Sequence, residues 1–425
     1  MRLPLPLAAL GALTMAAIAK TADFPPPSKL PGNAEMPDPT VMLDGTKVTT
    51  QKDWEAKRRP ELKELFQHYM YGRYPAKPEK VSTKVLFEDA KAFGGKGILR
   101  EVEITFGPPE WPKIYLLLAV PIGMTPAPCY LGPNFQGNHC LVAEERVRIT
   151  PDWCYPGTPG VKNFKASAEG RGKVLDVWPF EQIIGRGYAV ATFYVGDIQP
   201  DRPDVREGMR ATMPAPRRGD SVVEDETATI MWWAWGVHRV VDYLVTNKEI
   251  MSGSLVVVGH SRLGKTALLA GALDDRISIV IPHQSGCGGA GPSRSKNAKA
   301  ETVKRINTSF PHWFSTSFKA FNDDTTKLPF DQNCLVAMCA PRPVLMTNAE
   351  EDQWANPSGQ FDVLKAAVPA YEFYNLAKPL VAEKMPETGT LSADRLGYFI
   401  RKGTHSMTPA DWKVFMDFGD RWLKP

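Results

Sequence analysis

Two patterns of hydrophobic residues divide the chain. In the first 120 residues, three short segments alternate hydrophobic and polar side chains, at 84–87, 99–106 and 113–120. This period of two predicts antiparallel strands at the leading edge of a sheet. From residue 130 onward, helical segments alternate with short continuous hydrophobic runs, at 188–195, 255–258, 277–281, 344–347 and 396–400. Such runs are typical of buried parallel strands, so we expect an α/β fold whose mostly parallel sheet is covered on both faces.

Helical spacing is clearest in two segments. Hydrophobic residues recur at three and four positions in 228–245, and a second helical patch covers 54–71. The chain contains no internal repeat and no long low-complexity linker. We therefore expect a single domain over residues 20–425, with an N-terminal edge at about 20–110 and a catalytic core at about 111–425.

The first 19 residues have the layout of a secretory signal peptide. Arg2 precedes a hydrophobic stretch, and Ala17-Ile18-Ala19 supplies the small residues of a cleavage site. A membrane anchor is the alternative, but the stretch is shorter than the ~20 residues that cross a bilayer, and a proline-rich segment follows it. We predict a signal peptide at 1–19 and a secreted or periplasmic protein without a membrane segment.

Composition and charge narrow the functional classes. Hydrophobic residues make up 43% and charged residues 23% of the chain, as in ordinary globular proteins. The net charge is only +4, and no run of five or six like charges occurs, which argues against nucleic-acid binding. The 34 glycines and 38 prolines indicate many ordered loops. A monomeric, loop-rich enzyme is the expectation.

Six cysteines form an even number in a chain expected to mature in an oxidising compartment. One or more disulfides are therefore expected, but the spacing does not choose among the fifteen pairings. The sequence contains no C-x-x-C motif and no histidine pair at i, i+4. We expect neither a metal nor a cofactor.

A nucleophile candidate lies where one buried run meets a helix. The run at 254–258 is followed by Gly259-His260-Ser261-Arg262-Leu263-Gly264-Lys265, and then by a helix rich in Ala and Leu. A serine at a sharp strand-to-helix turn is the context of the nucleophile elbow. The second glycine, Gly264, falls one place late for the G-x-S-x-G pattern. The alternative role of Ser261 is that of a simple helix N-cap.

A serine nucleophile needs a general base that is oriented by a carboxylate. Of the downstream histidines, His312 lies in an aromatic cluster where packing explains it, whereas His405 follows the strand-like run at 396–400. His405 is therefore the predicted base. Glu350, Glu351 and Asp352 all follow the run at 344–347, and spacing alone does not select the acid.

Five motifs in this order resemble the glucuronoyl esterases of carbohydrate esterase family fifteen, in particular their bacterial branch. They are N-F-Q-G-N-H at 134–139, W-A-W-G-V-H-R at 233–239, G-H-S-R-L-G-K at 259–265, S-G-C-G-G-A at 285–290 and G-T-H at 403–405. The resemblance implies an α/β-hydrolase, a three-layer αβα sandwich without a metal. It also implies cleavage of esters between (4-O-methyl-)glucuronic acid of glucuronoxylan and lignin alcohols.

The resemblance also implies roles for individual residues. Ser261 corresponds to the nucleophile, His405 to the base, and Arg262 to the arginine that helps to stabilise the oxyanion. Substrate contacts are implied for Lys265, Glu301 and Trp354. The alternatives are that Lys265 and Glu301 are solvated helix charges and that Trp354 is a core residue.

Two departures from the fungal members of this family affect the expectations. The fungal catalytic glutamate is replaced by Gln284, so the resemblance selects the other acid position of the family, Asp352. The cysteines that join the nucleophile turn to the histidine loop in fungal members are replaced by His260 and Ser406. That disulfide is therefore not expected in this chain.

Two other functions compete with a glucuronoyl esterase. One is a carbohydrate esterase of different specificity, such as an acetyl xylan esterase, which would use the same triad. The other is a non-catalytic carbohydrate-binding relative, an idea motivated by Gln284. The presence of Ser261, His405 and Asp352 argues against the second alternative.

Overall fold

The computed structural model describes residues 24–203, 207–213, 217–218, 221–222 and 226–423. The signal peptide predicted at 1–19 lies outside this range. Among the helices of the described residues, none combines the length and the hydrophobicity that crossing a bilayer requires.

A nine-stranded sheet forms the centre of the molecule, with the order β1-β2-β3-β5-β4-β8-β9-β10-β11. Its first part is antiparallel and consists of β1 (Ser82–Lys91), β2 (Gly97–Thr105) and β3 (Ile114–Pro121). The parallel part consists of β4 (Ala127–Asn134), β5 (Ala189–Tyr194), β8 (Ile250–His260), β9 (Ile279–His283), β10 (Val344–Ala349) and β11 (Leu396–Arg401). Strands β3 and β5 join the two parts in antiparallel pairing. All predicted strands are confirmed, and β4 is an additional one.

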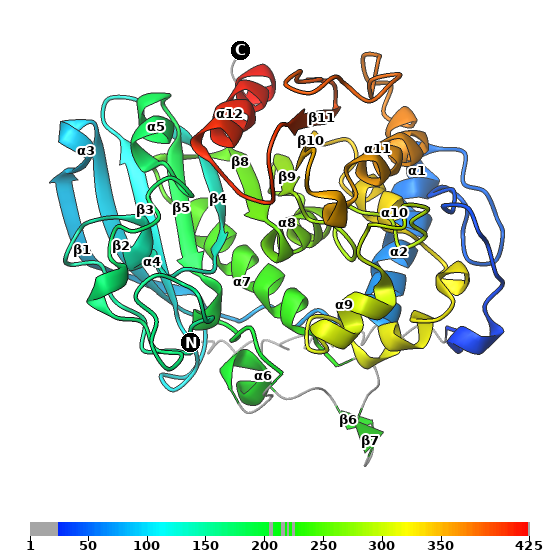
Figure 1. The fold of residues 1–425 in the computed structure, drawn as a ribbon, viewed down its shortest axis with the longest axis horizontal. Helices are drawn as coiled ribbons and strands as arrows, with labels where there is room; N and C mark the ends of the chain where they lie inside the picture. Colours follow the sequence, from blue (N-terminus) through cyan, green and yellow to red (C-terminus); the bar gives the residue numbers. More distant parts are fainter. Residues whose placement is uncertain (1–23, 204–206, 214–216, 219–220, 223–225, 424–425) are drawn as a thin grey trace, which may run out of the picture.

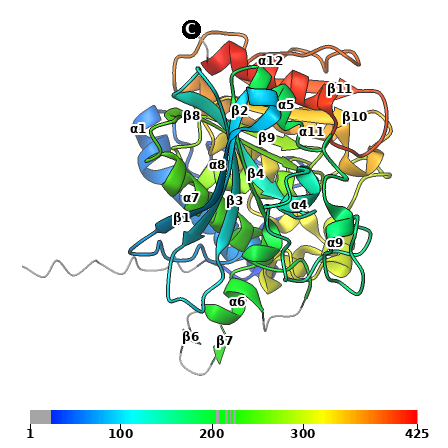
Figure 2. The same cartoon turned by 90° about the vertical axis from the view of Figure 1, so that its left-hand side faces the viewer.

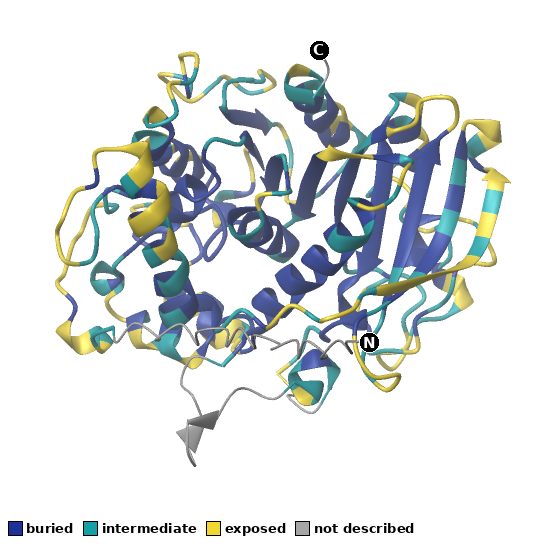
Figure 3. Ribbon diagram, turned by 180° about the vertical axis from the view of Figure 1, so that it is seen from behind, coloured by how far each residue is buried: buried dark blue, intermediate teal, exposed yellow. Residues whose placement is uncertain are grey.

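Burial follows the position of each strand in the sheet (Figure 3). Every residue of β5, β9 and β10 is buried, as expected for strands covered on both faces. Strand β1 lies at the edge, and most of its residues are exposed or half-buried. The continuous hydrophobic runs of the sequence therefore mark the centre of the sheet.

Helices cover both faces of the sheet (Figures 1 and 2). Alternate residues of β8 belong to two separate hydrophobic clusters. Val256 and Val258 pack in the cluster that includes α5 (Phe180–Gly185) and α12 (Pro409–Leu423). Val257 packs in the larger cluster on the other face, with α7 (Thr229–Leu244), α8 (Arg262–Leu273), α10 (Gln332–Ala337) and α11 (Pro357–Glu372). This is the predicted three-layer α/β-hydrolase sandwich.

The predicted helical patch near the N-terminus is one continuous helical stretch in which two segments have π geometry. Its parts are α1 (Gln51–Asp53), η2 (Trp54–Arg58), α2 (Arg59–Phe66) and η3 (Gln67–Tyr71). Aromatic pairs dock it on the C-terminal half of the chain, because the ring of Phe66 lies 4.0 Å from that of Phe330 and the ring of Trp54 lies 6.2 Å from that of Phe373.

Short elements complete the described chain. The helices are α3 (Ala92–Gly95), α4 (Asn138–Leu141), α6 (Gly208–Thr212) and α9 (Val303–Ser309), and a small hairpin is formed by β6 (Arg217–Arg218) and β7 (Ser221–Val222). Short 3₁₀ helices are η1 (Pro27–Lys29), η4 (Ala168–Gly170), η5 (Val195–Asp197), η6 (Thr316–Phe321), η7 (Thr325–Lys327) and η8 (Gln353–Ala355).

The cysteines do not pair. All six lie within the described residues, and each is buried with a free thiol. Burial raises the pKa of every one of these thiols, so they behave as small hydrophobic side chains. The expectation of one or more disulfides, which rested on the even number of cysteines, is therefore wrong.

Buried histidines couple the stability of the fold to pH. Burial lowers the pKa of His139 and of His238 from 6.5 to about 4. The unfolded chain therefore binds more protons than the folded protein between pH 6.5 and 4, and stability rises with pH across that window. The contribution of these two histidines to the free energy of unfolding is therefore fully present above pH 6.5.

We expect the free energy of unfolding to fall as the pH drops from 7 to 5, by about 1.4 kcal/mol per pH unit for each fully titrating histidine. Urea unfolding at a series of pH values measures this slope. In His238→Gln the free energy of unfolding should depend less steeply on pH, because about one proton fewer is taken up on unfolding. The glutamine amide can still bond Tyr74 and Ala270, but it does not titrate. A flat dependence in the wild-type protein would contradict the prediction.

Candidate active site

The turn after β8 has the geometry of a nucleophile elbow. Ser261 has φ 59° and ψ −124°, a strained conformation for a residue with a side chain, and α8 begins at the next residue. Both glycines of the motif are required sterically. A Cβ on Gly259 would lie 1.9 Å from the Leu263 oxygen, and one on Gly264 would lie 2.7 Å from the Ser285 Cβ. The late position of Gly264 therefore preserves the close packing of an elbow.

His405 and Asp352 come together at the same edge of the sheet, beyond β11 and β10. The Nδ1 of His405 lies 2.6 Å from Oδ2 of Asp352. The imidazole also contacts His260, the residue before Ser261, in a tilted arrangement with ring centroids 4.6 Å apart. Because the carboxylate can only accept, His405 donates through Nδ1 and keeps the Nε2 lone pair for a proton. This is the arrangement that a general base requires.

Only one of the three neighbouring acids reaches the histidine. The Asp352 side chain is 4% exposed, and its Oδ1 accepts a hydrogen bond from the Ala355 backbone. Glu350 and Glu351 are exposed, and Glu350 bonds the Thr388 hydroxyl instead. Of the three acids, Asp352 is therefore the one in hydrogen-bonding contact with His405.

Gln284 joins the nucleophile turn to the histidine loop. Its Oε1 lies 3.1 Å from Nε2 of His260 and accepts a hydrogen bond of 2.9 Å from the Ser406 backbone. Burial lowers the pKa of His260 well below 6.5, and the nearby histidines His283 and His405 contribute. His260 is therefore a neutral donor to the amide. His260 and Ser406 are thus linked through one glutamine oxygen.

Arg262 is held in a cage of aromatic rings beside Ser261. Its guanidinium carbon lies 5.0–5.8 Å from the centres of four rings, those of Phe135, Tyr155, Phe310 and Trp313. An ion pair with Asp201 fixes one end of the guanidinium. Arginine has five N–H donors in a planar fork, so other donors stay available for a ligand.

Lys265 and Glu301 face each other in the interior. The lysine Nζ lies 3.8 Å from Glu301 Oε2 and donates to the backbone oxygens of Ser285 and Cys287, the latter at 2.6 Å. Burial lowers the pKa of Lys265 and raises that of Glu301, and each charge opposes the shift of the other. The side chains are 4% and 7% exposed, so neither is a solvated helix charge.

Trp354 is 48% exposed, which is unusual for a tryptophan and excludes a place in the core. Its backbone oxygen accepts a hydrogen bond of 3.0 Å from the Glu301 backbone. Trp354 also lies two residues after Asp352. The loop that carries the acid therefore also presents an aromatic surface next to Glu301.

Comparison with known proteins places these features in a family. The family model for glucuronyl esterase of fungi matches residues 223–375. A curated relative, Carbohydrate esterase MZ0003 from an unknown prokaryotic organism, is 42% identical over 396 residues, covering 91% of this chain and 89% of its own. The solved structure of a promiscuous CE15 esterase from a marine bacterial metagenome has 40% identity and a TM-score of 0.85, over 93% of this chain and 99% of its own. The chain belongs to carbohydrate esterase family fifteen.

A second family-fifteen structure agrees with this assignment. The glucuronoyl esterase from Solibacter usitatus is 32% identical, with a TM-score of 0.84 over 93% of this chain and 99% of its own. The sequence resemblance to bacterial family-fifteen enzymes is therefore confirmed, and with it the α/β-hydrolase fold.

Asp201, which the sequence did not single out, holds Arg262 in this family-fifteen protein. Besides Arg262, it accepts hydrogen bonds from His312 Nε2 at 2.8 Å and from Trp313 Nε1 at 2.7 Å. Burial raises the pKa of Asp201, but these partners outweigh it and hold the pKa below the usual value. His312, expected to be a packing residue, is a donor that holds this carboxylate in place.

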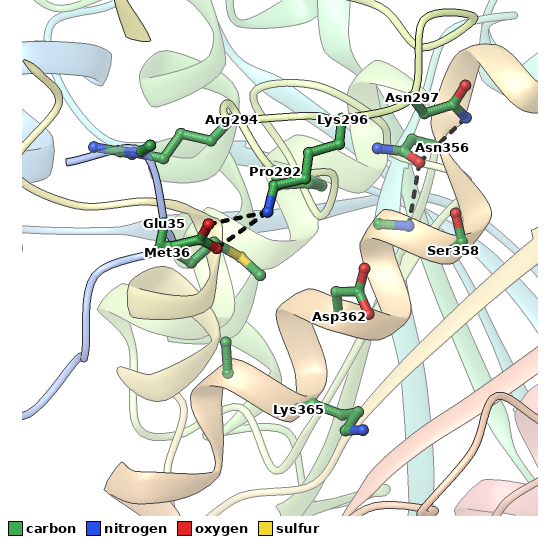
Figure 4. Close-up of a pocket in the computed structure, with 13 residues that line it drawn as sticks. Glu35, Met36, Pro292, Arg294, Lys296, Asn297, Asn356, Ser358, Asp362 and Lys365 are labelled. Atoms are coloured by element: carbon green, nitrogen blue, oxygen red, sulfur yellow. Dashed lines mark hydrogen bonds and ion pairs between the residues drawn. The ribbon is translucent and has the colours of Figure 1, made fainter. Parts of the chain in front are cut away.

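The protein also has a cavity of about 700 Å³, lined in part by Asn356, two residues after Trp354 (Figure 4). Several of its polar side chains are already engaged in hydrogen bonds or ion pairs. Lys296 pairs with Glu35 at 3.0 Å, and the Asn356 oxygen accepts a bond from the Gly359 backbone at 3.1 Å. The Asn356 contact caps the start of α11 and so fixes the end of the loop that begins at Asp352.

Proposed function

We propose that the protein is a serine esterase that hydrolyses the ester between (4-O-methyl-)glucuronic acid of glucuronoxylan and lignin alcohols. The observation that carries this proposal is the 2.6 Å contact between His405 and Asp352, beside the elbow that presents Ser261. Membership of the family and its glucuronoyl esterase structures support the choice of substrate.

In the proposed mechanism, the Ser261 hydroxyl attacks the glucuronoyl carbonyl and passes its proton to Nε2 of His405. The tetrahedral intermediate collapses, the C–O bond to the alcohol breaks, and His405 returns the proton to the leaving alkoxide. Water then attacks the acyl-enzyme with His405 again acting as base. Glucuronate and free Ser261 result.

Charge that develops in the transition state would be met by the backbone N–H after the nucleophile and by the Arg262 side chain. Since esterification masks the acid of the sugar, the reacting centre is neutral until the oxyanion forms. A cation at this place therefore favours the transition state over the ground state. A single donor of this kind is worth ~3 kcal/mol.

Lys265, Glu301 and Trp354 are proposed to bind the sugar. Their support is their position, since the Lys265 and Glu301 side chains meet at 3.8 Å and Trp354 lies in the same loop as Asp352. A buried cation and a buried carboxylate offer donors and acceptors to hydroxyl groups, and an exposed ring offers a flat apolar face.

The substrate panel that tests this function consists of methyl glucuronate, acetylated xylose and p-nitrophenyl acetate. We expect kcat/KM to be highest for the glucuronate ester by at least roughly a hundredfold, since buried polar groups are left unpaired by a substrate that lacks their partners. Equal rates on the three esters would favour a carbohydrate esterase of other specificity. Failure of a serine-directed phosphonate to label the protein would favour a non-catalytic binding protein.

We also propose a single domain over residues 20–425, released by removal of residues 1–19, and a secreted or periplasmic monomer. The support is the signal-like start of the sequence and the polymeric nature of the proposed substrate, which lies outside the cell.

A further inference from the structure

A polar cavity of about 800 Å³ adjoins the candidate active site. Its walls come from the turn between β2 and β3, from the long segment 148–165, from 196–202 and from α6. This volume is within the range of pockets that enclose small ligands. The mechanism proposed above makes no use of the cavity.

Two chain segments connect the cavity to Arg262. Pro200 and Arg202 line the cavity, whereas Asp201 between them forms the ion pair with Arg262. In the same way, Trp153 lines the cavity, and the Tyr155 ring lies 5.0 Å from the Arg262 guanidinium carbon. The rings of Trp153 and Tyr155 are 5.9 Å apart. The cavity and the site therefore share a wall.

The lining combines flat aromatic surfaces with many hydrogen-bonding groups. Phe164 is 49% exposed and stacks on Trp153 at 5.7 Å and 16°. Tyr115 contributes another ring, covered by Arg148 at 3.8 Å. Acidic and basic side chains are equal in number, four of each, so the cavity has no strong net charge. Such a lining suits a neutral ligand with apolar faces and hydroxyl edges, because rings can stack on its C–H groups while charged side chains bond its hydroxyls.

We propose that this cavity binds the neutral xylose units of the polysaccharide that carries the scissile ester. The proposal rests on the proposed function, and it identifies the part of the substrate that extends beyond the glucuronate. The observation that carries it is the shared wall, since on two segments the cavity lining lies within two residues of a side chain that contacts Arg262. A phenolic alcohol would instead require a mainly apolar lining.

The test compares two benzyl esters, one of glucuronic acid alone and one of glucuronic acid attached to xylotriose. In Phe164→Ala we expect kcat/KM for the xylotriose ester to fall roughly tenfold, mainly through KM, and that for the simple ester to change less than about twofold. Phe164→Tyr should retain the wild-type ratio. The matched control is Leu175→Ala, which removes a side chain of similar exposure, 48%, outside the cavity.

Equal losses on the two esters, or no loss on either, would overturn the proposal. The proposal would also be overturned if Phe164→Ala lost activity on the benzyl ester of glucuronic acid but not on the methyl ester. The cavity would then bind the alcohol.

Calorimetry with xylotetraose separates this proposal from the esterase function, since the oligosaccharide contains no ester. Weaker binding to Phe164→Ala than to Leu175→Ala supports the cavity assignment even if glucuronate esters are not hydrolysed. Absence of xylotetraose binding to the wild-type protein would refute it.

Discussion

Ser261→Ala should lower kcat for benzyl glucuronate by at least about 10⁴-fold, because the variant lacks the hydroxyl that forms the acyl-enzyme in the proposed mechanism. The protein should remain folded. The Ser261 side chain makes no capping hydrogen bond to α8, and the bond from its backbone N–H to the His283 oxygen at 2.9 Å does not involve the side chain. Steady-state hydrolysis and thermal unfolding, measured on the same preparation, check both statements.

Ser261→Gly is the informative companion. It should be as inactive as the alanine variant but more stable than it, by about 1 kcal/mol, since φ 59° and ψ −124° are strained for any residue with a Cβ. If either variant retained more than a few per cent of wild-type activity, Ser261 would not be the nucleophile. If Ser261→Ala were more stable than Ser261→Gly, the backbone of residue 261 would not be strained in the folded protein.

Asp352→Asn should lower kcat by about 10³–10⁴-fold. The asparagine amide can donate to Nδ1 of His405, and this favours the tautomer in which Nε2 carries the hydrogen. That nitrogen can no longer accept the Ser261 proton. The same variant also lacks the charge that stabilises the imidazolium. Rates on benzyl glucuronate, together with the pH profile of kcat/KM, measure the effect.

Gln284→Ala is the matched control for the choice of acid. The Gln284 oxygen bonds His260 and the Ser406 backbone rather than the His405 ring, so its loss should loosen the histidine loop and cost less than about tenfold. Equal losses in the two variants would contradict the assignment of Asp352. A larger loss in Gln284→Ala would mean that the position used by fungal enzymes still governs the base.

The hydrophobic pattern predicted most of the sheet, and the strand it missed shows its limit. Strand β4 contains Pro128, Gly132 and Pro133, residues that argue against a central strand. Pairing with β8 is irregular between Ala127 and Cys129, so Pro128 sits where a ladder bond is already missing. Gly132 is required by packing, because a Cβ there would lie 1.9 Å from the Val258 oxygen. Such contacts are not visible in the local sequence.

For the candidate site, local signals indicated residues at which a strand ends in a short loop. Ser261 and His405 could be selected on this basis, and Asp352 required the additional resemblance to a family. Asp201 had no such signal, since it lies in a segment rich in Pro, Asp and Arg that reads as solvated. Its partners Arg262, His312 and Trp313 follow 61, 111 and 112 residues later. Only the tertiary fold brings them together.

The link through Gln284 has a consequence for the redox behaviour of the enzyme. Two hydrogen bonds to one amide oxygen join the nucleophile turn to the histidine loop, and all six thiols are free. Thiol reductants have no bond to break in this arrangement, and the native fold forms without an oxidation step. The reducing cytoplasm of a bacterial host should therefore yield the same active conformation as an oxidising compartment.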